Sequence, residues 1–449
     1  MTLSKKLPII ILLFFTFLFN SGFTVVGHRG DPVAAPEESF QSIDAAISNG
    51  AQWVELDVHK SNDQQLIISH DRNLERVTGN NMVVSEHSAA ELTALKQHNG
   101  QNIYTLDQLF DHYQNQPQVK FLIETKKTKS GNPQDMEALL VAAIKRHHLE
   151  KRVMVHSFSL ASLQNMQKLL PKIPRIFIAG SLKRLDFEVF ATSTAVNLSS
   201  EIITPTLVKQ LHDLGQKVYV WDEMNENPQK WNWLVNLPID GVVTNYPGAA
   251  AYYQKLKQQV QQQTTDFQAF YANLQATPIW ENPYPGAPQK GNLAPTTPIH
   301  VNQIINLNQT TTYLQIGTNR FIAAQGVINT NHQAQLLPYL GQPVTLSYLA
   351  SDRNLHLAPN QASPYRGSLQ THNLYRITAL QDILGASWCQ LNGQGWYPLQ
   401  NLLAANPQPT STILNPSWTW TLLQQKRPLS SLPTINYLIY RIADLTPLQ

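Results

Sequence analysis

Short apolar runs alternate with amphipathic segments over the first half of the chain, from Thr24 to about Ala251. The runs predict β-strands, because strands buried on both faces read as near-continuous apolar stretches. The spacing of apolar residues in the segments between them predicts helices. The predicted strands are Thr24–Gly27, Trp53–Val58, Leu66–Ser69, Val119–Glu124, Val153–His156, Arg175–Ile178, Ala195–Leu198, Lys217–Trp221 and Gly241–Thr244.

The predicted helices are Ser39–Asn49, Asp135–His148, Ser159–Leu170 and Pro205–Leu214. Ser39 stands where an N-cap belongs, and Pro205 stands where a first-turn proline belongs. A strand–helix alternation of this length predicts an α/β fold, a (β/α)₈ TIM barrel over residues 24–251. A doubly wound parallel sheet is the alternative.

The second half of the chain has a different pattern. After about Ile299 come short β-like runs that are rich in Thr, Asn and Gln and carry little charge. Three stretches resemble one another weakly, Tyr313–Val327, Tyr375–Leu402 and Tyr437–Leu445. We expect small β-modules in tandem over residues 299–449. Residues 252–298 read as a helical connector followed by a Pro/Gly-rich linker.

The N-terminus predicts export. Lys5 and Lys6 precede an unbroken apolar run from Leu7 to Phe19, as in a secretory signal peptide. The run is short for a membrane span, which needs about 20 residues. Residues 1–23 are therefore a signal peptide or a membrane anchor, and the two remain open. The location expected is extracellular or at the cell surface.

Composition narrows the class of protein. At 449 residues, with 42% hydrophobic residues, the chain predicts two or three globular domains. A net charge of +3 argues against a nucleic-acid partner. Cys389 is the only cysteine, so no disulfide forms within the chain. An exported protein without disulfides is typical of a Gram-positive bacterium.

Two predicted strand segments contain carboxylate side chains. In WVELDVHK, Glu55 and Asp57 point to the same side of the strand, because side chains alternate. Two carboxylates facing one way favour a hard divalent cation, Ca²⁺ or Mg²⁺; the alternative is the polar face of a half-exposed edge strand. In LIETK, Glu124 adds a third carboxylate, and Lys126 on the same face can contact an anionic substrate group.

Two histidines follow apolar runs in TVVGH and LIISH. A lone histidine of this kind is more often structural. His28 and His70 together suit acid–base chemistry around a phosphate. Arg29, beside His28, can bind that phosphate, because a guanidinium group donates two parallel hydrogen bonds to its oxygens.

Together these segments resemble the sequence motifs of the glycerophosphodiester phosphodiesterase family. The matching words, in order, are HRG (28–30), PEES (36–39), GAQWVELDV (50–58), ISHDRNLERVTG (68–79), LIETK (122–126), HSF (156–158), LHDLGQKVYVW (211–221) and DGVVTNYP (240–247). The resemblance covers residues 24–250 or so. It implies a TIM barrel that binds a divalent metal and hydrolyses glycerophosphodiesters to glycerol phosphate and an alcohol.

The resemblance also implies roles for single residues. His28 and His70 match the acid–base pair, without showing which of them is the acid. Glu55, Asp57 and Glu124 match the metal ligands. The remaining matches are substrate-binding residues: Arg29 and Lys126 at the phosphate, Trp221 as an aromatic of the pocket, and Glu37 in the family's Pro-Glu-Asn motif. Glu38 departs from that motif, because it replaces the asparagine.

The tail carries a weaker resemblance. WCQLNGQGWYPLQNL is similar to GW-type, SH3-like modules that bind bacterial cell walls, which implies a wall-polymer partner. The alternative is a β-domain whose Trp and Tyr residues are core. For the whole chain, two further hypotheses stay open: a related barrel phosphodiesterase with another headgroup specificity, and a surface-binding protein with a silent barrel.

Overall fold

The computed structural model describes residues 22–404, except for 127–132, 134, 223–225, 309, 310, 348, 349, 372 and 384. The chain divides into two compact units, one ending at Lys257 and the other beginning at Gln258. The predicted signal or anchor segment and the third weak repeat, Tyr437–Leu445, lie outside the described residues, apart from Gly22 and Phe23.

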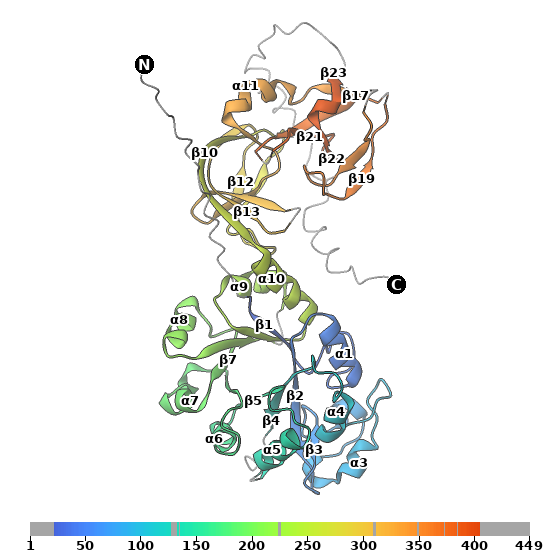
Figure 1. Cartoon of the computed structure of the whole chain (residues 1–449), viewed down its shortest axis with the longest axis vertical. Helices are drawn as coiled ribbons and strands as arrows, with labels where there is room; N and C mark the ends of the chain where they lie inside the picture. Colours follow the sequence, from blue (N-terminus) through green and yellow to red (C-terminus); the bar gives the residue numbers. More distant parts are fainter. Residues whose placement is uncertain are drawn as a thin grey trace, which may run out of the picture. The chain divides into compact units, whose positions relative to one another are not determined.

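The first unit is a closed barrel of parallel strands (Figure 1). Its strands are β1 (Thr24–Gly27), β2 (Trp53–Lys60), β4 (Phe121–Thr125), β5 (Val153–Ser157), β6 (Arg175–Ala179), β7 (Ala195–Ser199), β8 (Lys217–Trp221) and β9 (Gly241–Thr244). β1 pairs with both β2 and β9, which closes the sheet. The barrel prediction is confirmed, and closure excludes the doubly wound sheet. The remaining predicted strand, β3 (Leu66–Ile68), pairs antiparallel with β2 and lies outside the barrel.

Helices surround the strands. Four lie where the pattern predicts them, α1 (Phe40–Ser48), α5 (Met136–Arg146), α6 (Leu160–Leu169) and α8 (Pro205–Asp213). Ser39 caps α1 by accepting the amide of Ser42, and Pro205 is the first residue of α8. The others are α2 (Glu75–Thr78), α3 (Ala89–Thr93), α4 (Leu106–His112), α7 (Phe187–Thr192), α9 (Pro228–Asn236) and α10 (Pro247–Gln259), with short 3₁₀ turns η1 (Val84–Glu86) and η2 (Leu182–Arg184).

An apolar layer fills the barrel interior. Its residues come from seven strands, Val26, Leu122, Met154, Ile176, Ala195, Tyr219 and Val243. Because side chains alternate along a strand, the residue two positions further on also points inward, one layer nearer the carboxyl ends. For six of these strands that residue is His28, Glu124, His156, Ile178, Asn197 or Trp221. The apolar layer thus supports a layer of mixed polar and apolar side chains.

The second unit contains two antiparallel sheets. The first has the order β12-β11-β15-β14-β13-β10-β16, with β10 (Gln261–Tyr271), β11 (Thr277–Trp280), β12 (Gln289–Leu293), β13 (Thr297–Asn306), β14 (Thr312–Gly317), β15 (Arg320–Ala323) and β16 (Val327–Asn329). The second has the order β19-β18-β22-β21-β20-β17-β23, with β17 (Pro343–Leu346), β18 (Asn354–His356), β19 (Tyr365–Ser368), β20 (Tyr375–Gln381), β21 (Trp388–Leu391), β22 (Gly395–Pro398) and β23 (Leu402–Ala404).

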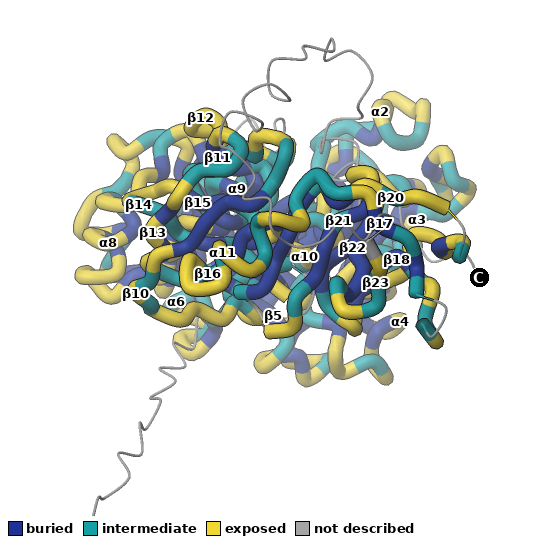
Figure 2. The backbone as a smooth tube through the Cα atoms, turned by 90° about the horizontal axis from the view of Figure 1, so that it is seen from above, coloured by how far each residue is buried: buried dark blue, intermediate teal, exposed yellow. Residues whose placement is uncertain are grey.

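The two sheets share one core. Phe270 and Ile328 of the first sheet belong to the same buried cluster as Leu380 and Tyr397 of the second. Backbone hydrogen bonds also cross between them, for instance from the Leu380 amide to the Ala272 carbonyl. β22 is buried along its whole length (Figure 2). The two sheets confirm the expected β-rich C-terminal region, which also contains the short helix α11 (Gln333–Leu336) and the 3₁₀ turns η3 (Thr330–His332), η4 (Leu337–Tyr339) and η5 (Leu399–Asn401). The SH3-like identity of its modules stays a prediction.

The structure corrects the predicted linker. Residues 252–298 were expected to form a helical connector and a loop, but after α10 they contribute β10, β11 and β12 to the first sheet. The Gln-rich start of β10 is solvent-exposed, so it lacks the apolar periodicity that identifies a strand from sequence. Its pairing partners, β13 and β16, lie far along the chain. In the described part of the chain, no helix is both long and apolar enough to cross a membrane.

Candidate active site

Parallel register brings the predicted carboxylates to one end of the barrel. Asp57 of β2 lies beside Glu124 of β4, and Glu124 lies beside His156 of β5. The carboxyl ends of barrel strands form the face where enzymes of this fold carry their chemistry. Glu55, Asp57 and His156 are almost completely buried. Their polar atoms have lost contact with water and need polar partners within the protein.

The loop after β1 adopts an unusual backbone that reaches toward these carboxylates. Arg29 has a φ of 54° and Glu38 a φ of 59°. The Arg29 amide donates to Glu55 Oε2 at 2.9 Å, and Glu38 Oε1 accepts the Asp57 amide at 2.8 Å. At Gly30, with a φ of 91°, an added Cβ would lie 2.3 Å from the Ser42 hydroxyl oxygen, so only glycine fits. The loop is therefore built around the two β2 carboxylates.

Glu55, Glu124 and His156 form a compact donor cluster. One ligand atom from each lies within 4.8 Å of the others, and His156 Nε2 is 3.2 Å from Glu55 Oε1. Burial, and then the nearby charge of Asp57, raise the pKa of Glu55 and of Glu124 to about 7. Burial lowers the pKa of His156 to about 4, so its ring is neutral and its nitrogens can coordinate a cation.

Asp57 has a different set of neighbours. Lys126 Nζ lies 2.9 Å from Asp57 Oδ1 and 3.0 Å from Glu124 Oε1, and Arg29 Nε lies 3.6 Å from Asp57 Oδ2. Burial alone would raise the pKa of Asp57, but the charges of Lys126, His70 and Arg29 lower it overall. Asp57 is thus an ionised anchor for the two cations predicted to bind phosphate. Its assignment as a metal ligand stays a prediction.

The two predicted acid–base histidines are held through the same ring nitrogen. His28 Nδ1 is 2.7 Å from Asn245 Oδ1, and His70 Nδ1 is 2.9 Å from Asp71 Oδ1. Each ring is thereby oriented by its Nδ1 contact, which leaves Nε2 as the atom available for proton transfer.

Arg76, on α2, connects His70 to the PEES loop. Its Nε donates to Asp71 Oδ2 at 2.5 Å, and its two terminal nitrogens donate to Glu37 at 2.6 and 2.9 Å. Glu37 also accepts from Arg29 at 3.3 Å. The structure therefore places Glu37 as a bridge between two arginines.

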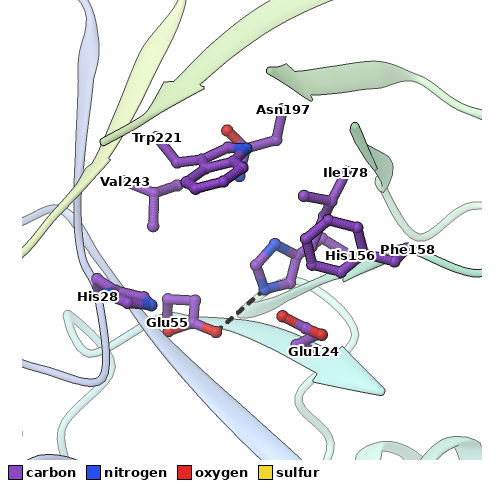
Figure 3. Close-up of a pocket in the computed structure, with 9 residues that line it drawn as sticks. All are labelled: His28, Glu55, Glu124, His156, Phe158, Ile178, Asn197, Trp221 and Val243. Atoms are coloured by element: carbon purple, nitrogen blue, oxygen red, sulfur yellow. Dashed lines mark hydrogen bonds and ion pairs between the residues drawn. The ribbon is translucent and has the colours of Figure 1, made fainter. Parts of the chain in front are cut away.

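A pocket opens at the centre of this barrel face (Figure 3). Figure 3 shows His28, Glu55 and Glu124 along one edge of the pocket and Asn197, Trp221 and Val243 opposite them, with His156, Phe158 and Ile178 grouped together between these two sets. Of the predicted site residues, His28, Glu55, Glu124 and Trp221 line the pocket. The other five belong to the charged network beside it: Arg29, Glu37, Asp57, His70 and Lys126.

Two polar lining residues were not predicted to have a role, His156 and Asn197. His156 ends the apolar run VMVH, just as His28 and His70 end theirs, so a signal was present in the sequence. Asn197 stands inside an apolar strand, and only the inward direction of its side chain distinguishes it from a solvent-facing asparagine.

The buried carboxyl groups predict how stability depends on pH when no metal is bound. Burial and the charge of Asp57 raise the pKa of Glu38, Glu55 and Glu124. From about pH 6.5 to 8.5 the unfolded chain has no carboxyl protons left to lose, whereas the folded protein still releases protons. The free energy of unfolding therefore falls as pH rises through about 7. The lowered pKa of His156 acts in the opposite direction, but only until the histidine of the unfolded chain has lost its proton, by about pH 7.5.

We expect the Tm of the full chain in EDTA to be several degrees lower at about pH 8.5 than at about pH 6.5. Ca²⁺ or Mg²⁺ should reduce this difference, because a bound cation stabilises the ionised carboxylates. Differential scanning calorimetry at the two values, with and without the ion, measures both effects. A Tm that is equal or higher at the upper pH would contradict the carboxyl assignment.

Comparisons with known proteins concern the barrel. Residues 28–249 match the model of the glycerophosphoryl diester phosphodiesterase family. A glycerophosphodiester phosphodiesterase of Caldanaerobacter subterraneus subsp. tengcongensis is 26% identical over 235 residues, which cover 50% of this chain and 94% of the relative. One from Bacillus altitudinis is 26% identical over 237 residues, covering 50% and 96%. A crystal structure of a glycerophosphodiester phosphodiesterase from Parabacteroides distasonis covers 52% of this chain and 97% of its own, with 23% identity and a TM-score of 0.46.

Proposed function

Because residues 28–249 form a domain of the glycerophosphoryl diester phosphodiesterase family, and the chain is accordingly a glycerophosphodiester phosphodiesterase, we propose that its hydrolysis depends on a divalent metal ion and takes place outside the cell. The observation that carries the metal dependence is the buried cluster of Glu55, Glu124 and His156.

The donor set fits a divalent cation. Two carboxylates and a neutral imidazole converge within 4.8 Å, and His156 Nδ1 has no hydrogen-bond partner in the described part of the chain. Burial, and then the charge of Asp57, raise the pKa of Glu55 and Glu124, so a bound cation would stabilise their ionised forms. Carboxylate oxygens favour Ca²⁺ or Mg²⁺. When bound, the ion would supply Lewis-acid stabilisation of charge on the phosphate oxygens.

The protein's own side chains account for the other requirements of hydrolysis. Arg29 and Lys126, both held by Asp57, present positive charge beside the carboxylate cluster and can stabilise the non-bridging oxygens of a phosphodiester. His28 and His70 each have Nδ1 engaged, so Nε2 of one can accept a proton from the nucleophile while Nε2 of the other donates one to the leaving oxygen. The nucleophile is water or a neighbouring hydroxyl of the glycerol.

The test is to strip the full chain of metal and re-supply Ca²⁺ or Mg²⁺. Glycerophosphocholine and poly(glycerol phosphate) would be offered, and released glycerol phosphate measured. We expect release that requires the ion, and the preferred substrate separates deacylated phospholipids from teichoic-acid-type polymers. Full release in EDTA would overturn the metal dependence. Metal binding without release from either substrate would favour another headgroup specificity or a silent barrel.

We also propose that the C-terminal unit binds cell-wall polymer. The proposal is supported by the two antiparallel sheets of this unit and by the signal-like apolar run Leu7–Phe19 in the sequence. Trp388, Trp396 and Tyr397 of the GW-containing stretch are buried, so the polymer would contact other residues of the unit. The chain and a shortened form ending at Lys257 would be sedimented with purified Gram-positive walls. Equal retention of the two forms would count against wall binding by this unit.

A further inference from the structure

Asn197 is a polar side chain buried in the less polar wall of the pocket. It lies in β7, two residues after Ala195 of the apolar layer, and is 2% exposed. Its Oδ1 has no hydrogen-bond partner in the part of the chain that the structure describes. A buried amide oxygen without a hydrogen bond is costly, so its presence in a pocket calls for a partner that the described residues do not provide.

Trp221, on the neighbouring strand β8, presents a second unpaired group. Its Nε1 is buried and makes no hydrogen bond to any described residue. β7 and β8 are paired so that Ser199 lies beside Trp221, which places Asn197 and Trp221 on adjacent strands facing the same interior. Figure 3 shows both side chains across the pocket from Glu55 and Glu124. The pocket therefore offers an acceptor and a donor away from its carboxylates.

We propose that Asn197 and Trp221 recognise the hydroxyl groups of the glycerol moiety, an inference that rests on the proposed function. A hydroxyl can donate to Asn197 Oδ1 and accept from the Trp221 N–H, so an alcohol satisfies both atoms. Either orientation of the carboxamide offers an acceptor and donors. Ile178 and Val243 supply apolar contact for the carbon chain. A moiety of the same shape without hydroxyls would leave both polar atoms unpaired, and such sites discriminate strongly.

The test compares two ligands that share a phosphate and three carbons, sn-glycerol 3-phosphate and n-propyl phosphate. In calorimetric titrations of the full chain, we expect the first to bind at least about tenfold tighter. Asn197→Leu should bring the ratio close to one by weakening glycerol phosphate alone. Trp221→Phe, which keeps a ring but removes the N–H, should reduce the ratio in part.

Controls separate recognition from folding. Asn165→Leu, on α6 outside the pocket lining, should keep the wild-type ratio, and thermal unfolding should find Asn197→Leu at least as stable as wild type. Asn197→Ala provides a second variant should leucine disturb the barrel. A preference that persists in both variants overturns the proposal, as does a wild-type chain that binds the two ligands equally or binds neither.

Kinetics distinguish this inference from the proposed function. If the chain hydrolyses glycerophosphocholine but its ligand preference does not depend on Asn197, the enzyme assignment stands and hydroxyl recognition is rejected. Conversely, an Asn197-dependent preference without hydrolysis would keep the recognition site and reject the function on which its glycerol assignment rests.

Discussion

Replacing Glu55 with glutamine is expected to reduce both metal affinity and hydrolysis by more than about 100-fold, because the proposed metal site loses one of its buried carboxylates. The amide oxygen can still accept the Arg29 backbone N–H that Glu55 Oε2 binds at 2.9 Å. The fold should therefore persist. Calorimetric metal titration and steady-state release of glycerol phosphate measure the two losses, and circular dichroism checks the fold.

The matched control is Glu150→Gln, which makes the same chemical change at an exposed turn after α5. It should leave metal affinity and turnover unchanged. Unchanged activity in Glu55→Gln itself would reject the cluster as a metal site.

Replacing His70 with alanine is expected to lower kcat by about 10²–10⁴-fold, the usual contribution of a positioned acid or base. Metal affinity should change little, because His70 lies outside the Glu55–Glu124–His156 cluster. The contrast between a lost kcat and a retained metal distinguishes proton transfer from coordination. Single-turnover kinetics and metal titration provide the two measurements.

His148→Asn is the control for this variant. His148 is exposed and has a φ of 55°, a conformation that asparagine tolerates, so the exchange should be silent. A decrease in kcat below tenfold for His70→Ala would show that His70 is not the acid or the base.

Strand alternation was enough to predict where the barrel strands lie and which way their carboxylates point. Thr24–Gly27, Lys217–Trp221 and Gly241–Thr244 have the predicted bounds, and Glu55 and Asp57 share an inward face. Alternation gives direction but not partners. The pairing of Asp57 with Lys126 and Arg29 depends on the loop after β1, whose positive φ at Arg29 has no clear sequence signal.

The linker shows the converse limit. β10 begins with exposed glutamines, and its strand character comes from partners that follow it by tens of residues. Local pattern cannot supply such long-range pairing. Asn197 was missed for a related reason, because its significance lies in an Oδ1 atom that has no hydrogen-bond partner among the described residues, which only the packed barrel reveals.

The route by which the chain enters the barrel restricts how an attached enzyme could face its surroundings. Phe23 leads into the amino end of β1, and the late α10 residue Gln254 is bonded to its carbonyl group, whereas the pocket opens at the carboxyl ends of the strands. Phe23, the last residue of the predicted signal or anchor segment, therefore lies at the end of the barrel opposite the pocket. If that segment were retained as an anchor, soluble diesters and wall polymers would reach the pocket without passing the point of attachment.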